Sequence, residues 1–135
     1  MDDGRRSWWG WGWEKGQLDE GQMSALATAV ADRLGVSQLE RCQPPALSDL
    51  NLAPPRLTPP PSLASICSTQ VYDRAAHTYG KSFSDVVRAV HGQVEHPPDV
   101  VAFPTKESEV VAVLDWCSVA GAAAVPYGGG SSVVD

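Results

Sequence analysis

The residues with the clearest chemistry lie near the C-terminal end, in the segment Pro126-Tyr127-Gly128-Gly129-Gly130-Ser131-Ser132-Val133. Three successive glycines allow backbone conformations that other residues avoid, and no Cβ prevents a ligand from approaching the backbone. Such a loop directs several N–H groups toward one point, which suits an anion such as phosphate or pyrophosphate. The two serines add hydroxyl donors. We therefore predict that this loop binds a phosphate-containing ligand.

Two better-known phosphate-binding loops do not fit this segment. A P-loop needs a lysine followed by serine or threonine after its glycines, and no lysine follows Lys106. The Rossmann fingerprint spaces its glycines and opens a helix, whereas here the glycines are adjacent and the sequence stops at Asp135. A triple glycine alone also suits a flexible turn, so its meaning depends on the elements that precede it.

The residues before the loop predict a strand, a helix and a second strand. Residues 99–103 form a short apolar run, typical of a strand that is covered on both faces. Thr105 is placed to cap a helix that Gly121 ends, and residues 122–126 form the second apolar run. The order strand, helix, strand predicts a βαβ unit with parallel strands and a right-handed crossover.

The N-terminal segment is dominated by tryptophan and proline. Four of the five tryptophans lie in residues 8–13, here called the Trp arm, whose glycines break helical and strand patterns. Because tryptophan buries a large area, we expect the arm to cover an apolar surface of this chain or of a partner, rather than to stack on a ligand. Residues 20–34 have helical periodicity, and Gly35 follows them. Seven of the eleven prolines lie between Pro44 and Pro61, which predicts an extended connector.

The middle segment predicts short helices and no metal centre. Residues 62–79 indicate short helical pieces, and Ser82 opens a clearer helix with capping-box spacing to Asp85. The three histidines lack the spacing of a ligand set on one helix face, and the three cysteines are widely separated without a Cys-x-x-Cys pair. We therefore predict neither a metal site nor a disulfide framework.

Charge and hydropathy exclude several classes of partner. Ten basic against sixteen acidic residues give a net charge of −6, and the basic residues are scattered, which argues against a nucleic-acid partner. No apolar run reaches the length of a transmembrane segment. Arg5 and Arg6 precede the Trp arm, but glycines interrupt that stretch too often for an export signal. We predict a cytoplasmic protein.

Several of these segments resemble a known superfamily. Residues 98–105, the helix after them and residues 125–133 resemble the start of the FAD-binding domain of the vanillyl-alcohol oxidase or para-cresol methylhydroxylase (PCMH) type. Within that superfamily, residues 8–12 and 73–82 resemble the alkyldihydroxyacetonephosphate synthase family, also called alkylglycerone-phosphate synthase.

The resemblance implies an α+β fold with an N-terminal helical and extended arm, followed by the opening βαβ unit of an incomplete PCMH-type FAD-binding domain. The implied division is residues 1–61 for the Trp-rich arm, helix and proline-rich connector, 62–97 for a helical segment, and 98–135 for the start of the flavin domain.

The resemblance also implies a cofactor and a reaction. FAD is held non-covalently, because the histidine that attaches flavin in some members is absent from the loop. The implied FAD-binding residues are Pro126, Tyr127, Gly128, Gly129, Gly130, Ser131, Ser132 and Val133. Synthases of this family exchange the acyl group of acyl-dihydroxyacetone phosphate for a fatty alcohol in ether-lipid biosynthesis, so the implied substrate is lipid-like.

Two alternatives to synthase chemistry stay open at this point. Other members of the superfamily use FAD to oxidise 2-hydroxy acids, and a small interaction protein would use the Trp arm for docking. The family's substrate pocket and acid/base residues are missing from this sequence, so we nominate no catalytic residue and expect no activity from this chain alone. A companion chain is one source of the missing part.

Overall fold

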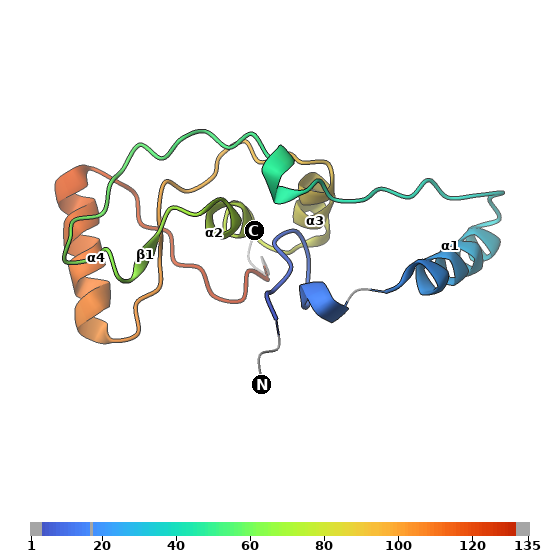
Figure 1. Ribbon diagram of the computed structural model, residues 1–135, viewed down its shortest axis with the longest axis horizontal. Helices are drawn as coiled ribbons and strands as arrows, with labels where there is room; N and C mark the ends of the chain where they lie inside the picture. The colour runs from blue at the N-terminus through green and yellow to red at the C-terminus, as the bar shows by residue number, and fades with distance from the viewer. Residues whose placement is uncertain (1–3, 17, 132–135) are drawn as a thin grey trace.

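The fold is that of a computed structural model, which describes residues 4–16 and 18–131. Its elements, in chain order, are the 3-10 turn η1 (Glu14–Gly16), α1 (Glu20–Leu34), the 3-10 turn η2 (Leu47–Asp49), β1 (Cys67–Ser68), α2 (Val71–Ala76), α3 (Phe83–Val90), β2 (Val101–Ala102) and α4 (Glu107–Ala120). Helices α1 and α4 lie at opposite ends of the molecule, with α2 and α3 between them, and the proline-rich connector runs extended along one side (Figure 1). The predicted α+β class is confirmed.

Local capping signals set the ends of the helices. Helix α1 spans the predicted residues, begins at a capping box between Asp19 and Gln22, and ends at Gly35 in the left-handed conformation with φ 68°. Helix α3 begins at the predicted capping box of Ser82 and Asp85.

The predicted start of α4 is wrong by one residue. Lys106, not Thr105, is the N-cap, and its side chain makes no capping bond. Thr105 instead donates its backbone N–H and its hydroxyl to the Glu109 carboxylate, at 2.8 and 3.1 Å. Gly121 ends the helix as predicted, with φ 64°.

The predicted parallel pairing of residues 99–103 with 122–126 does not form in the described chain. Strand β2 pairs antiparallel with β1, in the register Cys67 to Ala102 and Ser68 to Val101. Residues 122–126 follow α4 without strand structure, and Val125 is 83% exposed. Two-residue strands have few ladder bonds, and antiparallel pairing is the more stable arrangement per residue. Strand β1 lies within residues 62–79, for which the sequence predicts helical pieces throughout, so the prediction is wrong at this strand.

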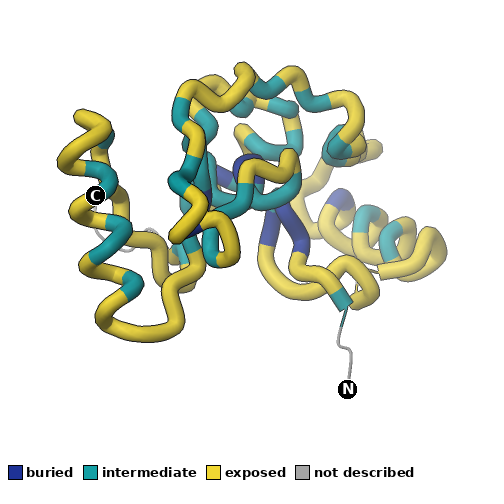
Figure 2. The backbone as a smooth tube through the Cα atoms, turned by 60° about the vertical axis from the view of Figure 1, so that its left-hand side comes forward, coloured by how far each residue is buried: buried dark blue, intermediate teal, exposed yellow. Residues whose placement is uncertain are grey.

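The buried core is small and partly polar. The buried apolar residues of the described chain are Trp8, Ala31, Leu63, Ala75 and Val101, and the buried polar residues are Ser7, Arg74 and Asp85. Figure 2 shows buried backbone only in short stretches, and α4 has no buried residue. Apolar burial of this extent cannot hold every segment in place by itself, so polar contacts across long sequence separations become important.

Arg74 on α2 makes the most buried of these polar contacts. Arg74 is only 4% exposed. Its Nε donates to the Pro98 carbonyl at 2.7 Å, and its Nη2 donates to the Ala53 carbonyl at 2.6 Å. A guanidinium has five N–H donors in a rigid plane and no acceptor, so it is suited to joining carbonyl groups of different segments. Arg74 thereby attaches both the connector and the segment before β2 to α2.

A second contact joins the connector to the same segment at the surface. The Asp99 carboxylate accepts hydrogen bonds from the backbone N–H of Arg56 at 2.8 Å and from its guanidinium at 3.1 and 2.8 Å. The Arg56 side-chain bonds, with the backbone bond, hold the pKa of Asp99 below its ordinary value. Ionised Asp99 is therefore the form that the folded chain stabilises.

Replacing Arg74 with alanine is expected to lower the free energy of unfolding by about 2–3 kcal/mol, because two carbonyls lose their donor and a cavity forms. Urea denaturation followed by tryptophan fluorescence measures this loss. The matched control is Arg41→Ala, which removes an exposed ion pair to Glu20 at 3.0 Å and should cost less than about 1 kcal/mol. Equal losses in the two variants would show that the buried guanidinium has no special role.

The Asp99 contact predicts a pH dependence. Because the folded state lowers this pKa, its stabilisation is present above the unfolded value of about 3.9 and is lost as the pH falls toward the lower folded value. Comparing urea midpoints of the natural chain and Asp99→Asn from pH 7 to pH 3 isolates this group. The natural chain should be the more stable at pH 7, and the difference should shrink below about pH 4. A difference that stays constant over this range contradicts the assignment.

Candidate functional site

The glycine loop follows α4 and the extended residues 122–126, and its first two glycines face open space. A Cβ added at Gly128 or Gly129 would meet no atom within 4 Å, and neither residue has a positive φ. Gly130 differs, because it has φ 70° and an added Cβ would collide with the Tyr127 hydroxyl. Only Gly130 therefore needs glycine for its conformation, whereas Gly128 and Gly129 leave the backbone open to approach.

The amides of Gly128 and Gly129 donate none of the hydrogen bonds between described residues. Both residues are exposed, as are Pro126 and Ser131. Exposed backbone N–H groups without a protein acceptor are suited to acceptor oxygens such as those of a phosphate. The described part of the loop therefore fits the predicted ligand class. Ser132 and Val133, which the sequence also assigns to this site, lie outside the described residues.

Tyr127 anchors the start of the loop to the end of α2. Its hydroxyl lies 3.2 Å from the Tyr79 carbonyl and 3.4 Å from the Ala76 carbonyl, so its single O–H is shared between these two acceptors. The edge of its ring packs against His77, with ring centroids 4.6 Å apart. Burial raises the pKa of Tyr127, so the hydroxyl keeps its proton and remains a donor at neutral pH.

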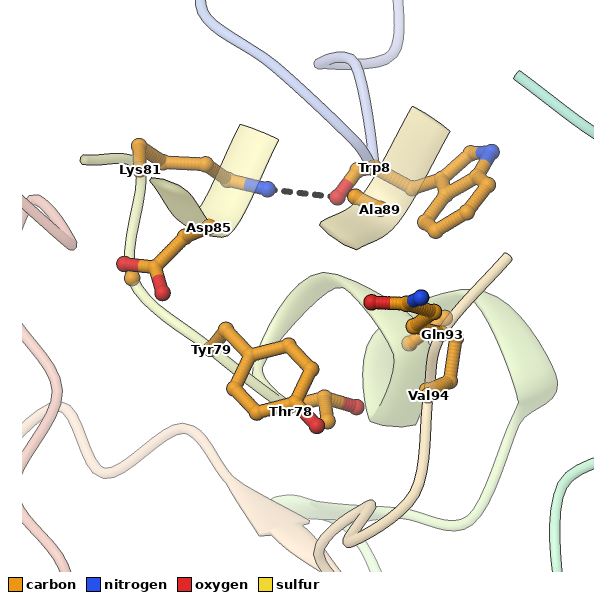
Figure 3. Close-up of a pocket in the computed structure, with 10 residues that line it drawn as sticks. Trp8, Thr78, Tyr79, Lys81, Asp85, Ala89, Gln93 and Val94 are labelled. Carbon is orange, nitrogen blue, oxygen red and sulfur yellow. Dashed lines mark hydrogen bonds between the residues drawn. The ribbon is translucent and has the colours of Figure 1, made fainter. Parts of the chain in front are cut away.

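Lys81 anchors the end of the loop and also receives the Trp arm. Its backbone N–H donates to the Gly130 carbonyl, and its carbonyl accepts from the Trp11 indole N–H at 2.8 Å. Its ammonium donates to the Trp8 carbonyl, the contact drawn as a dashed line in Figure 3. We call these four residues the Lys81 junction. Burial lowers the pKa of Lys81, and the nearby Asp85 carboxylate opposes that effect.

The Trp arm itself is a closed turn that lies on this chain. Arg6 and Trp13 form an isolated antiparallel bridge, and the Ser7 N–H donates to the Gly12 carbonyl at 3.0 Å. Trp8 is only 6% exposed, so the surface that the arm covers belongs to this chain, one of the two possibilities that the sequence left open. The Tyr72 hydroxyl fixes the base of the arm by donating to the Arg6 carbonyl at 2.9 Å.

The hollows of the structure do not coincide with the glycine loop. A cavity of about 10 Å³ lies between the arm, α2 and α3, with Trp8, Tyr79 and Lys81 in its wall (Figure 3). That volume is roughly the space for a single water molecule, so it is too small for an organic ligand. A wider, open hollow of about 460 Å³ lies between the connector and the end of α3, lined by residues that include Cys42 and His91.

The described residues contain neither a metal-ligating cluster nor a membrane-spanning helix. Within residues 4–16 and 18–131, no three histidine, cysteine, aspartate or glutamate side chains gather as a metal site. Cys42, Cys67 and Cys117 are free thiols. None of the helices in these ranges combines the length and the apolar character that crossing a membrane requires.

Sequence reasoning identified the loop but missed the residues that hold it. Tyr79 ends the stretch predicted as short helical pieces, and Lys81 lies in residues 73–82, which resemble the synthase family; the sequence predicts a contact with the loop for neither. Lys81 contacts Gly130 through its backbone N–H, and Tyr79 contacts Tyr127 through its backbone carbonyl. The residues of each pair are about 50 positions apart along the chain. Side-chain type carries no signal for such contacts, so the sequence contains no pattern that would have found them.

Comparison with known proteins points to one kind of enzyme. No protein-family model matches the chain. Two curated relatives are alkyldihydroxyacetonephosphate synthases: one from Trypanosoma brucei brucei, 32% identical over 62 residues, and one from Dictyostelium discoideum, 36% identical over 61 residues. These matches cover 46% and 45% of this chain but only 10% of each relative, so the chain matches about a tenth of their length.

Solved structures extend the similarity to nearly the whole fold. Two structures titled alkyldihydroxyacetonephosphate synthase superpose with TM-scores of 0.73 and 0.72 at 22% identity. Each superposition covers 96% of this chain and 29% or 28% of the solved chain. The resemblance predicted from the sequence is thereby confirmed: the chain is similar to alkyldihydroxyacetonephosphate synthases in sequence over about half of its length and in fold over nearly all of it.

Proposed function

We propose that this chain supplies the pyrophosphate-binding loop of an FAD-dependent enzyme of the alkyldihydroxyacetonephosphate synthase kind. The observation that carries this proposal is the glycine loop, which presents two exposed amides without acceptors among the described residues, between two anchored ends. Similarity to synthases in sequence and fold supports the choice of enzyme over a 2-hydroxy-acid oxidase.

The residues that would hold FAD are those of the predicted loop, Pro126 to Val133. The amides of Gly128 and Gly129 would contact the pyrophosphate oxygens, and the Ser131 hydroxyl would add a donor. Binding is non-covalent, because the loop contains no histidine. When bound, FAD supplies the flavin that assists the exchange of an acyl group for a fatty alcohol without net redox change.

We assign catalysis to the parts of the synthases that have no counterpart in this chain. The chain corresponds to about a tenth of the curated relatives, and neither of the two hollows described above lies at the glycine loop. We therefore propose that these residues bind FAD without turnover. The cytoplasmic location is part of the same proposal. The division of the chain after residues 61 and 97 stays a prediction. A separate interaction protein is less favoured, because Lys81 already engages Trp8 and Trp11.

FAD titration of the purified chain tests the loop. We expect weak binding, with a dissociation constant on the order of 0.1 mM, because one loop supplies only part of a cofactor site. Gly129→Ala should weaken binding roughly tenfold, since its Cβ occupies the space through which the ligand approaches, while circular dichroism stays unchanged. Flavin fluorescence and isothermal titration calorimetry measure both quantities.

The matched control is Gly16→Ala, which also places a Cβ in open space at a residue without positive φ. It should bind FAD like the natural chain. Equal affinity of Gly129→Ala and the natural chain would place FAD elsewhere or nowhere. Tight FAD that survives gel filtration would show that the chain already holds a complete cofactor site.

The absence of turnover is tested directly. Purified chain with excess FAD, acyl-dihydroxyacetone phosphate and a labelled fatty alcohol should form no labelled ether product above the level without protein. A synthase of the same family, assayed in parallel, provides the positive control. Product formation by the chain alone would contradict the assignment of catalysis to other polypeptide.

A further inference from the structure

Three segments that are distant along the chain meet at Lys81. The Trp arm reaches it through the Trp11 indole N–H, which donates to the Lys81 carbonyl at 2.8 Å, and through the Trp8 carbonyl, which accepts from the Lys81 ammonium. The glycine loop reaches it through Gly130, whose carbonyl accepts from the Lys81 N–H. Lys81 thus contacts the Trp arm through its carbonyl and ammonium groups, and the glycine loop through its backbone N–H.

The two anchors of the glycine loop lie close together in the same segment. Tyr127 is bound at the Tyr79 carbonyl and Gly130 at the Lys81 N–H, so Gly128 and Gly129 form a short bridge over residues 79–81. Fixing both ends of a short loop removes much of its conformational freedom before any ligand binds. The exposed amides of the loop are thereby held in place by residues 79–81.

The arm is the element that steadies this segment from the other side. Residues 82–85 are fixed by the capping box of α3, but residues 79–81 precede that helix and have no regular secondary structure. Trp8 is buried beside Lys81, and Figure 3 shows the Lys81 ammonium directed at the Trp8 carbonyl. Trp11 is 60% exposed, and its indole N–H donates the hydrogen bond to the Lys81 carbonyl that attaches this part of the arm.

We infer that docking of the Trp arm at Lys81 preorganises the glycine loop for its phosphate-containing ligand, with Lys81 and Trp11 as positioning residues. The identity of the ligand as FAD rests on the proposed function; the coupling of arm and loop does not. A preorganised loop loses less conformational freedom on binding, so affinity rises without a new contact to the ligand. Because such coupling is reciprocal, bound ligand also strengthens docking of the arm.

Trp11→Phe tests this coupling with a small change. It keeps an aromatic ring at an exposed position and removes the indole donor to Lys81, together with part of the ring area, a loss that the control below also makes. The matched control is Trp13→Phe, because Trp13 lies in the same arm, is 40% exposed, and its indole nitrogen donates no hydrogen bond among the described residues. Neither residue belongs to the predicted FAD-binding set.

Two readouts are needed, one with ligand and one without. In the ligand-free chain, amide hydrogen exchange at Lys81 reports its bond to Gly130, and Trp11→Phe should speed that exchange about fivefold, the factor expected for one ordinary hydrogen bond. In the FAD titration, Trp11→Phe should raise the dissociation constant by a similar factor. Trp13→Phe should change neither quantity.

The outcomes separate the inference from the proposed function. Faster exchange and weaker FAD binding, both confined to Trp11→Phe, support the coupling and its role in cofactor binding. Unchanged exchange in Trp11→Phe overturns the coupling, whatever happens with FAD. If no variant binds FAD, including the natural chain, the proposed function fails while the exchange data still decide the coupling. Faster exchange with unchanged FAD affinity overturns the positioning role.

Discussion

The Arg74 side chain joins three segments that the small apolar core leaves unconnected. Its guanidinium reaches the connector at Ala53 and the segment before β2 at Pro98, while its backbone belongs to α2. A buried charge is costly unless it is well hydrogen-bonded, and here the donors are used on carbonyls that would otherwise lack partners. The position of β2, and with it the path of the chain into α4 and the glycine loop, depends on this arrangement. At the surface, the Arg56–Asp99 contact also joins the connector to the segment before β2.

The candidate site depends on backbone groups more than on reactive side chains. Tyr127 and Gly130 are held by the Tyr79 carbonyl and the Lys81 N–H, and within residues 4–16 and 18–131 the amides between them have no acceptor. Such an arrangement suits binding of an anion and supplies no nucleophile or general base. This arrangement is the basis for the proposed role of the loop in holding a cofactor, for a chain that matches about a tenth of the length of the synthases to which it is similar.

The Trp arm has a structural explanation within the chain. A dense tryptophan cluster is unfavourable in water, and the arm resolves this by burying Trp8 and hydrogen-bonding Trp11 at Lys81. Arg6 covers the Trp13 ring at 4.7 Å, and Arg5 covers Tyr72 at 4.5 Å. The contacts of Trp8 and Trp11 with Lys81 also place the arm next to the glycine loop, so the two most unusual motifs of the sequence lie in one region.

Local features were determined by the sequence itself. Helix α1 ends at Gly35 and α3 begins at Ser82 because the capping residues act within one turn, and the proline-rich connector is extended because proline excludes regular structure wherever it folds. The triple glycine likewise marked the loop that the structure leaves open. Pairing of β2 with β1 and the meeting of arm and loop at Lys81 were decided only by the tertiary structure. Each of those contacts joins groups far apart along the chain and has a backbone N–H or C=O on at least one side. Because nearly every residue carries these backbone groups, the pattern of side chains does not specify which of them meet.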